Sequence, residues 1–165
     1  MSSEKGVEKY RSRAANYASK GEKSSRQVRE KLEAWSEGAL SREEIEAIVE
    51  ELQHHRIVDD ARYAAAYVSD KVKFGRRGPL LLRHELRSKG ISEGIIEERL
   101  SAINEEEWLQ TLTDFLQEKL KTYDISDPYA LRAKLFRAGA AKGFSSEMIS
   151  KALRRMNFGT DDFED

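Results

Sequence analysis

The side chains that could support chemistry begin with three histidines and many carboxylates. His54 and His55 are adjacent, while His84 lies far from them in the chain. Adjacent side chains on a helix point about 100° apart, so this pair is poorly placed to chelate one metal ion. The chain contains no cysteine that could complete a zinc site. We therefore predict neither a metal centre nor a cofactor.

The carboxylates have the pattern of solvated helix surfaces. Clusters such as Glu43, Glu44 and Glu46 are interspersed with lysine and arginine, as is usual on exposed helices. General acid–base catalysis needs carboxyl groups held in a pocket with shifted pKa values. The sequence also has no glycine-rich phosphate loop of a nucleotide-binding type and no nucleophile elbow. These features predict a protein that is not an enzyme.

The strongest candidate for an interaction surface is a run of cations between residues 71 and 89. Seven basic residues stand against one carboxylate, Glu85, which gives this segment a net charge of +6 in a chain of net charge -1. A concentrated positive face can attract a polyanion even when the whole protein is nearly neutral. The cations are Lys71, Lys73, Arg76, Arg77, Arg83, Arg87 and Lys89.

Within this run, Gly75 and Gly78 bracket Arg76 and Arg77, and Pro79 follows. Proline is favoured at the first position of a helix because that position needs no N–H donor. Two hypotheses remain open for the loop. Its arginines and the helix N-terminus could bind an anion, either phosphate or carboxylate, or the loop could be a soluble turn between helices.

The elements that carry these residues are predicted to be helices only. Apolar residues recur at helical spacing, and no segment alternates with period two over the length of a strand. A pattern of about 50 residues occurs three times, in which a helix-capping residue or glycine precedes a core leucine by eight positions. The pairs are Ser24 and Leu32, Gly78 and Leu86, and Asp127 and Leu135.

The third helix of each repeat begins after a serine, at Ser41, Ser92 and Ser145, and Ser41 with Glu44 forms a capping-box pattern. Tandem repeats of this size predict three three-helix modules in an elongated, curved array. The expected modules cover residues 8–57, 58–103 and 104–158. Residues 1–7 are expected to be a flexible lead-in, and residues 159–165 an acidic tail.

Two groups of residues near the basic run have predicted roles. Asp59 or Asp60 is expected to cap the helix that follows them, and Arg62 to pair with a carboxylate. Tyr63, Tyr67 and Phe74 are aromatic residues that could stack on nucleic-acid bases. Because Tyr67 occupies a core position of the repeat, we assign it to packing.

The cellular location and the oligomeric state are predicted from features that the sequence lacks. Residues 1–20 contain no apolar signal-peptide core, and no apolar run is long enough to cross a membrane. A chain without cysteine also suits a reducing compartment. We therefore expect a cytoplasmic protein, and the lack of a long heptad seam favours a monomer.

The segment from Ile57 to Ile91 resembles the RecX family of bacterial RecA regulators. Three motifs carry the resemblance: an acidic pair before an Arg-aromatic pair, a Gly-Pro helix start, and a Leu-x-x-Lys-Gly-Ile ending. Arg76 and Arg77 depart from the family, which often has an aromatic residue between the two glycines. The signature residues are Asp59, Asp60, Arg62, Tyr63, Tyr67, Gly75, Gly78, Pro79, Leu82, Leu86 and Gly90.

The resemblance implies a protein that binds the groove of the RecA–DNA filament. Such a protein would inhibit strand exchange, ATP hydrolysis and coprotease activity, and would thereby regulate DNA repair and the SOS response. The basic residues between 71 and 89 would supply most of the electrostatic attraction, with DNA met through the filament or directly. The alternative is a nucleic-acid-binding helical repeat protein that acts independently of RecA.

Overall fold

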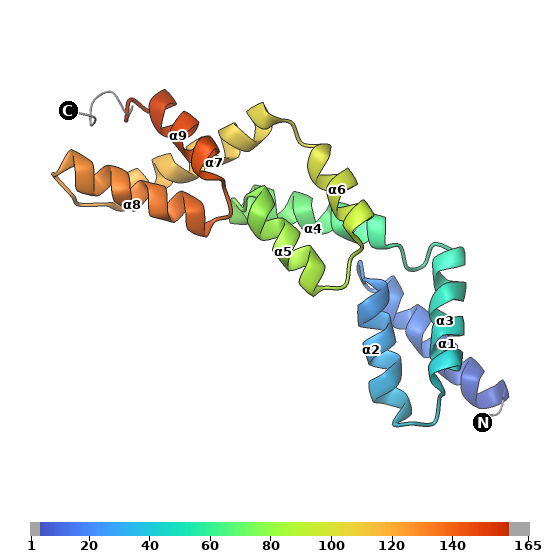
Figure 1. Ribbon diagram of the computed structural model, residues 1–165. Helices are drawn as coiled ribbons and strands as arrows, with labels where there is room; N and C mark the ends of the chain where they lie inside the picture. The colour runs from blue at the N-terminus through green and yellow to red at the C-terminus, as the bar shows by residue number, and fades with distance from the viewer. Residues whose placement is uncertain (1–3, 159–165) are drawn as a thin grey trace. The chain divides into compact units, whose positions relative to one another are not determined.

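The computed structural model describes residues 4–158, and every regular element within this range is an α-helix (Figure 1). The all-α prediction is confirmed. The helices are α1 (Glu4–Ser19), α2 (Ser25–Ser36), α3 (Arg42–His54), α4 (Asp60–Gly75), α5 (Pro79–Ser88), α6 (Glu93–Ser101), α7 (Glu105–Thr122), α8 (Pro128–Ala141) and α9 (Ser146–Arg155). The predicted lead-in is wrong for residues 4–7, which form the first turn of α1. The predicted acidic tail, residues 159–165, lies outside the described residues.

Helix starts follow the local capping signals. The Ser41 side chain accepts a hydrogen bond from the backbone N–H of Glu44, and the Glu44 carboxylate accepts one from the N–H of Ser41, which confirms the predicted capping box. Ser24 begins α2 in the same way, with Gln27 as its reciprocal partner. Asp127 and Ser145 cap α8 and α9 as N-cap residues. Short-range chemistry therefore sets where these helices begin.

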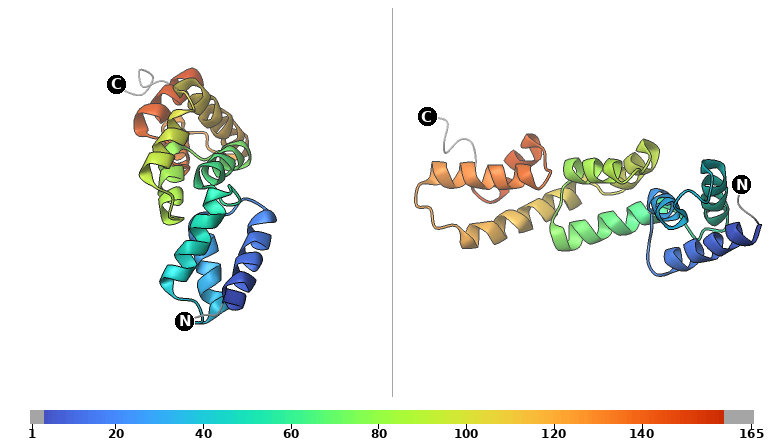
Figure 2. Two further views of the ribbon diagram at one scale, coloured as in Figure 1. Left: turned by 90° about the vertical axis from the view of Figure 1, so that its right-hand side faces the viewer. Right: turned by 90° about the horizontal axis from the view of Figure 1, so that it is seen from below.

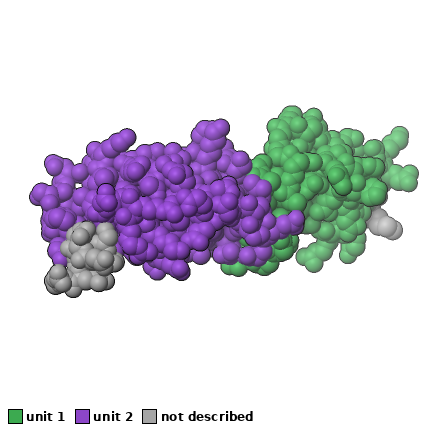
Figure 3. Space-filling view, turned by 90° about the horizontal axis from the view of Figure 1, so that it is seen from above, with its two compact units in different colours: residues 1–66, 86–96 green, residues 67–85, 97–165 purple. Residues whose placement is uncertain are grey.

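The chain divides into two compact units, coloured separately in Figure 3. Unit 1 comprises residues 1–66 and 86–96, and unit 2 comprises residues 67–85 and 97–165. The divisions fall within α4, α5 and α6, so parts of the expected middle module belong to each unit. The boundaries proposed for the three modules stay a prediction.

Unit 1 is built on α1, α2 and α3, which lie side by side in both views of Figure 2. Val28, Leu32, Ile48 and Val49 are completely buried between them. Ala14 is also fully buried, and its short side chain lets α1 approach its neighbours closely. A continuous apolar core of this kind supplies most of the stability of a small helical bundle.

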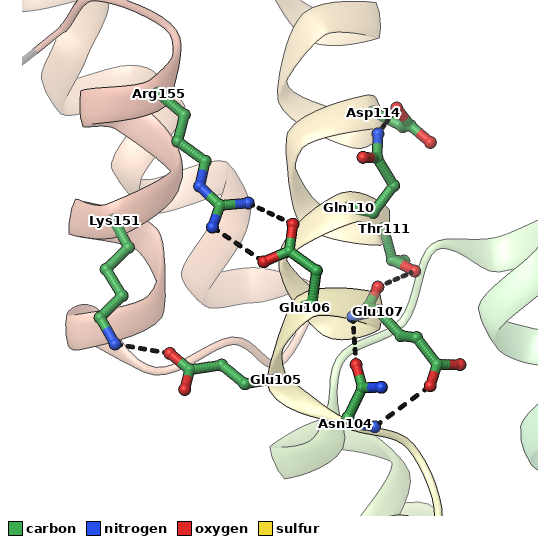
Figure 4. Close-up of polar contacts among 9 residues, drawn as sticks. All are labelled: Asn104, Glu105, Glu106, Glu107, Gln110, Thr111, Asp114, Lys151 and Arg155. Carbon is green, nitrogen blue, oxygen red and sulfur yellow. Dashed lines mark hydrogen bonds and ion pairs between the residues drawn. The ribbon is translucent and has the colours of Figure 1, made fainter.

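Unit 2 contains α7, α8 and α9, which pack on one another around Leu112, Leu135 and Leu153, all completely buried. Two ion pairs connect the beginning of α7 to α9 (Figure 4): Lys151 to Glu105 at 2.5 Å, and Arg155 to Glu106 at 2.7 and 2.9 Å.

These two ion pairs shift the pKa values of their members. The hydrogen bonds from Arg155 hold the pKa of Glu106 below its usual value, and the hydrogen bond to Glu105 raises the pKa of Lys151. Asn104 caps the same end of α7 and forms a capping box with Glu107 (Figure 4). The first turn of α7 is thus held both by its own cap and by α9.

Candidate functional site

The beginning of α4 is a structural junction within unit 1. Asp59 Oδ1 accepts a hydrogen bond from the backbone N–H of Arg62 at 3.0 Å, so the predicted cap is Asp59. Asp60 instead accepts hydrogen bonds from the backbone N–H and the hydroxyl of Ser25 at 2.7 and 2.8 Å. Asp60 therefore accepts hydrogen bonds from the first residue of α2, and of the two expected candidates Asp59 is the one that caps α4.

The prediction that Arg62 pairs with a carboxylate is confirmed. Its Nε lies 2.7 and 2.9 Å from the two carboxylate oxygens of Glu22. Its guanidinium also donates to the backbone carbonyls of Arg56 and Ile57, at 3.0 and 3.3 Å. Arg62 thus closes the α3–α4 connection and joins it to the α1–α2 connection.

The loop between α4 and α5 meets the α8–α9 connection within unit 2. The N–H of Gly78 donates to the carbonyl of Lys142 at 2.7 Å, and the N–H of Leu80 donates to the carbonyl of Gly143 at 2.9 Å. The Lys142 ammonium donates in turn to the carbonyl of Gly75 at 2.8 Å. Figure 1 shows the end of α8 close to the start of α5.

This arrangement corrects both hypotheses for the loop. An anion at the N-terminus of α5 would need free backbone N–H groups, but those of Gly78 and Leu80 already donate to carbonyl oxygens, and Pro79 has none. A Cβ atom on Gly78 would lie 2.6 Å from the carbonyl oxygen of Gly143. The loop is therefore neither an open anion site nor a simple solvated turn, but a close backbone crossing.

The arginines of the basic run are largely neutralised by carboxylates that follow in the sequence. Within unit 2, Arg77 pairs with Glu85, and this hydrogen bond raises the pKa of Arg77. Arg83 donates to Glu97 at 2.8 Å.

Arg76 is also paired, through contacts of 3.1 Å to Glu118 and 3.8 Å to Asp114. Counting charge only between residues 71 and 89 therefore overstated the positive field of this segment. Glu97, Asp114 and Glu118 all lie beyond it in the sequence.

The other four predicted cations are distributed differently. Arg87 and Lys89 belong to unit 1, where Arg87 Nη2 lies 3.0 Å from Glu93 Oε2. In unit 2, Lys71 lies 3.7 Å from Asp70. The ammonium of Lys73 sits over the ring of Phe74, 5.2 Å from its centroid. The structure therefore brings five of the seven predicted cations into one unit and two into the other.

The three candidate stacking aromatics differ in exposure. Tyr63 is buried, with 8% of its surface exposed, and this burial raises its pKa. Tyr67 is half-buried, and its hydroxyl accepts a hydrogen bond from Arg77 at 3.3 Å. Phe74 is 75% exposed. Of the three, Phe74 is the one whose ring faces solvent.

A groove in unit 2 was missed by sequence reasoning. It has a volume of about 430 Å³ and is lined by parts of α5, α7 and α8 together with the loops beside them. Phe115 lies in the groove, with the ammonium groups of Lys119 and Lys142 5.7 and 5.3 Å from its ring centroid. The lining residues are Arg77, Leu81, Glu85, Phe115, Lys119, Tyr123, Ala138, Ala141 and Lys142.

No sequence signal marked this groove, because its residues come from three separate stretches of the chain. Their spacing within each stretch resembles that of any amphipathic helix. Residues 4–158 contain no cluster of three or more His, Cys, Asp or Glu side chains that could hold a metal ion. Within the same range, no helix has the length and apolarity needed to span a bilayer.

Comparison with known proteins identifies the family. Residues 59–100 match the family model described as the second three-helix domain of RecX, and residues 105–153 match the model for its third three-helix domain. The chain belongs to the RecX family. Both matched domains have the three-helix organisation predicted from the repeat.

Curated RecX proteins match most of this chain. One from Levilactobacillus brevis, named "Regulatory protein RecX", is 31% identical over 96% of the chain and 58% of its own length. A namesake from Clostridium botulinum is 32% identical over 82% of the chain and 63% of its own length. The chain thus spans about three fifths of the length of these relatives.

Solved RecX structures have the same fold. The crystal structure of RecX from Lactobacillus salivarius superposes with a TM-score of 0.84 at 21% identity, covering 92% of this chain and 96% of the other. A second crystal structure, of regulatory protein RecX, gives a TM-score of 0.78 at 26% identity, covering 86% of this chain and 68% of the other. These superpositions support the tandem three-helix architecture.

Several RecX signature residues have contacts that explain them structurally. Asp60 and Arg62 connect α4 to the residues around α2, and Gly78 allows the backbone crossing at the start of α5. Leu82 and Leu86 are completely buried. Gly90 has a φ of 80°, a left-handed conformation that favours glycine. These signature residues therefore have structural roles, in hydrogen bonding, in core packing or in backbone geometry.

Proposed function

We propose that this protein is a cytoplasmic regulator of RecA that binds the RecA–DNA filament and inhibits its recombinase, ATPase and coprotease activities. The observation that carries the proposal is the match to two consecutive RecX domains over residues 59–100 and 105–153. Curated relatives that match this chain are named as regulatory proteins. In this role the protein acts by binding, as a monomer and without a cofactor.

The proposed contact surface is the basic run. Its seven cations should contribute unequally to the electrostatic attraction for a partner. A partner must compete with Glu85, Glu97 or Glu118 for the paired arginines, which reduces the attraction that each arginine can offer. Lys73 has no carboxylate partner among the described residues and is exposed, beside the exposed ring of Phe74. We therefore place the strongest attraction at Lys73 and Phe74.

The second candidate function is direct binding of single-stranded nucleic acid without RecA. The observation that favours it is the pairing of an exposed aromatic ring with a neighbouring ammonium group at Phe74 and Lys73. Aromatic stacking on a base contributes about 1–3 kcal/mol per base and tolerates any sequence. Contacts to phosphate would add a strong dependence on salt.

The decisive experiment is RecA-catalysed ATP hydrolysis on single-stranded DNA, titrated with this protein. RecA from the same organism is used, and DNA is held in excess. We expect ATP hydrolysis to fall at a substoichiometric ratio of this protein to RecA, and added DNA not to restore it. If extra DNA restores hydrolysis, the protein competes for DNA and the second function is correct.

A matched pair of charge reversals tests the surface. Lys73→Glu should weaken inhibition, whereas Lys9→Glu, an equal charge change at an exposed position of α1, should leave it unchanged. Equal effects of the two substitutions would show that only net charge matters and would refute the proposed surface. Direct binding to single-stranded DNA with four or five phosphate contacts would give a log–log salt slope of about -3 to -4.

A further inference from the structure

The groove of unit 2 concentrates positive charge that the protein itself does not neutralise. Lys119 and Lys142 point their ammonium groups at Phe115, and Lys134 lies beside the groove with its ammonium 4.4 Å from the ring centroid of Tyr123. None of these three lysines has a carboxylate partner among the described residues. This contrasts with Arg76, Arg77 and Arg83, which are all paired.

Between the lysines the groove has an apolar floor, and the Arg77–Glu85 ion pair, whose two charges offset each other, forms part of its lining. Leu81, Ala138 and Ala141 contribute short or aliphatic side chains beside the Phe115 ring. A volume of about 430 Å³ is enough for one large side chain with its neighbouring backbone. Lysines around an aromatic and aliphatic floor fit a peptide that carries several carboxylates and one apolar side chain.

The chain contains such a peptide in its own residues 161–165, Asp161-Asp162-Phe163-Glu164-Asp165. Its four carboxylates match the uncompensated lysines, and its one phenylalanine matches the apolar floor. Charge complementarity therefore favours this segment as the occupant. A segment attached to the same molecule also has a high effective concentration at the groove.

The length of the connection permits this contact. Phe158 is the last described residue, and its carbonyl accepts a hydrogen bond from Arg132 Nε on α8 at 3.4 Å. From Arg132 to Ala138 of the groove is about 9 Å along the helix. The chain from Phe158 to Phe163 extends about 17 Å. The tether is long enough to pass from this part of α8 toward the groove.

We propose that residues 161–165 bind the groove lined by Phe115, Lys119 and Lys142 in the same molecule. The carboxylates face the lysines, and Phe163 packs against the apolar floor. The groove is then a binding site for acidic peptides that the protein's own segment occupies. This proposal does not depend on RecA, so its test is separate from that of the proposed function.

The first test uses the full chain and a full-length variant whose acidic segment is neutralised by D161N, D162N, E164Q and D165N. Backbone amide NMR spectra of the two proteins should differ at Phe115, Lys119, Ala138 and Ala141, and should agree throughout α1–α3. No chemical-shift change at the groove would overturn the proposal. Far-UV circular dichroism checks that both proteins are equally folded.

The second test measures binding of a fluorescent peptide with the sequence of residues 159–165. The neutralised variant should bind it about tenfold more tightly than the parent, the factor expected if a tethered segment at about 1 mM competes for a site with a Kd of about 100 μM. In the neutralised variant, Lys119→Glu should reduce binding at least about fivefold, since it reverses a charge at the site. Lys121→Glu, an exposed neighbour on α7 that does not line the groove, should have little effect.

The other outcomes contradict the proposal. Equal peptide binding by the parent and the neutralised variant would show that the internal segment does not occupy the groove. Equal effects of the Lys119 and Lys121 substitutions would place the peptide elsewhere. If a single-stranded oligonucleotide bound the groove of the neutralised variant and the peptide did not, the groove would be a nucleic-acid site.

Discussion

Replacing Gly78 with alanine should destabilise unit 2, because the added methyl group would clash with the backbone of Gly143. The added Cβ atom would lie 2.6 Å from the carbonyl oxygen and 2.7 Å from the carbonyl carbon of Gly143. Ordinary contacts at Cβ begin at 3.4 Å, so the two backbones would have to separate by roughly 1 Å. Because both contacts are to backbone atoms, no side-chain rotation can relieve them.

The cost follows from this displacement. Overpacking of a close contact typically costs about 1–3 kcal/mol, and separation would also stretch the 2.7 Å hydrogen bond from the Gly78 N–H to Lys142. We expect a loss of about 2–3 kcal/mol. With a urea m-value of about 2 kcal/mol/M, the unfolding midpoint would fall by about 1–1.5 M.

The two tryptophans make this effect measurable in each unit, because Trp35 lies in unit 1 and Trp108 in unit 2. In a Trp35→Phe background, Trp108 fluorescence reports on unit 2 during urea unfolding. Gly94→Ala is the control for a glycine-to-alanine change without a clash, since its Cβ would meet nothing within 4 Å in the first turn of α6. This control should leave the Trp108 unfolding midpoint of unit 2 unchanged. A Gly78→Ala protein as stable as the parent would refute the reasoning.

Three further predictions concern other contacts. Asp60→Ala should cost about 1–3 kcal/mol in urea unfolding, because it leaves the buried N–H of Ser25 without this acceptor; a loss under 0.5 kcal/mol would contradict this role. The hydrogen bond from Arg29 lowers the pKa of Glu46, so the stabilisation is fully present above the usual pKa of glutamate and is lost as the pH falls through the lower folded-state pKa. The urea midpoint of Glu46→Gln should therefore lie below that of the parent at pH 7, and the gap should narrow as the pH is lowered into the acidic range; a constant gap would disprove the assignment. Leu86→Ala should cost about 2–5 kcal/mol, since the side chain is completely buried, and thermal unfolding that changes by less than a few degrees would argue against a packed core there.

The features that the sequence predicted correctly depend on neighbouring residues. The Ser41–Glu44 capping box involves groups three positions apart, so the pattern alone defines the helix start. Leu32, Leu86 and Leu135 occupy the same place in each repeat and are all completely buried. Helical periodicity carries this information because one face of each helix must be apolar.

The features that the sequence did not predict depend on contacts between distant residues. The sequence left an anion site and a soluble turn both open for the loop at Gly78, because the carbonyls that accept its hydrogen bonds belong to the distant Lys142 and Gly143. The charge of the basic run looked unbalanced because Glu97 and Glu118 come later in the chain. A local charge count cannot include partners that only the tertiary structure brings near.

The hydrogen bonds from Ser25 to Asp60 also bear on how such a repeat protein can evolve. The N-terminus of α2, in the first repeat, is completed by a carboxylate from the second. Helix α2 keeps its own capping box at Ser24, and Asp60 adds acceptors for Ser25 that the first repeat does not supply by itself. After a duplication, one repeat can in this way come to depend on its neighbour for part of its hydrogen bonding. A fragment that ends at residue 57 would lack Asp60 and Arg62, whereas one that ends at residue 66 keeps both. The repeat is therefore a unit of inheritance, and independent folding requires a longer piece of chain.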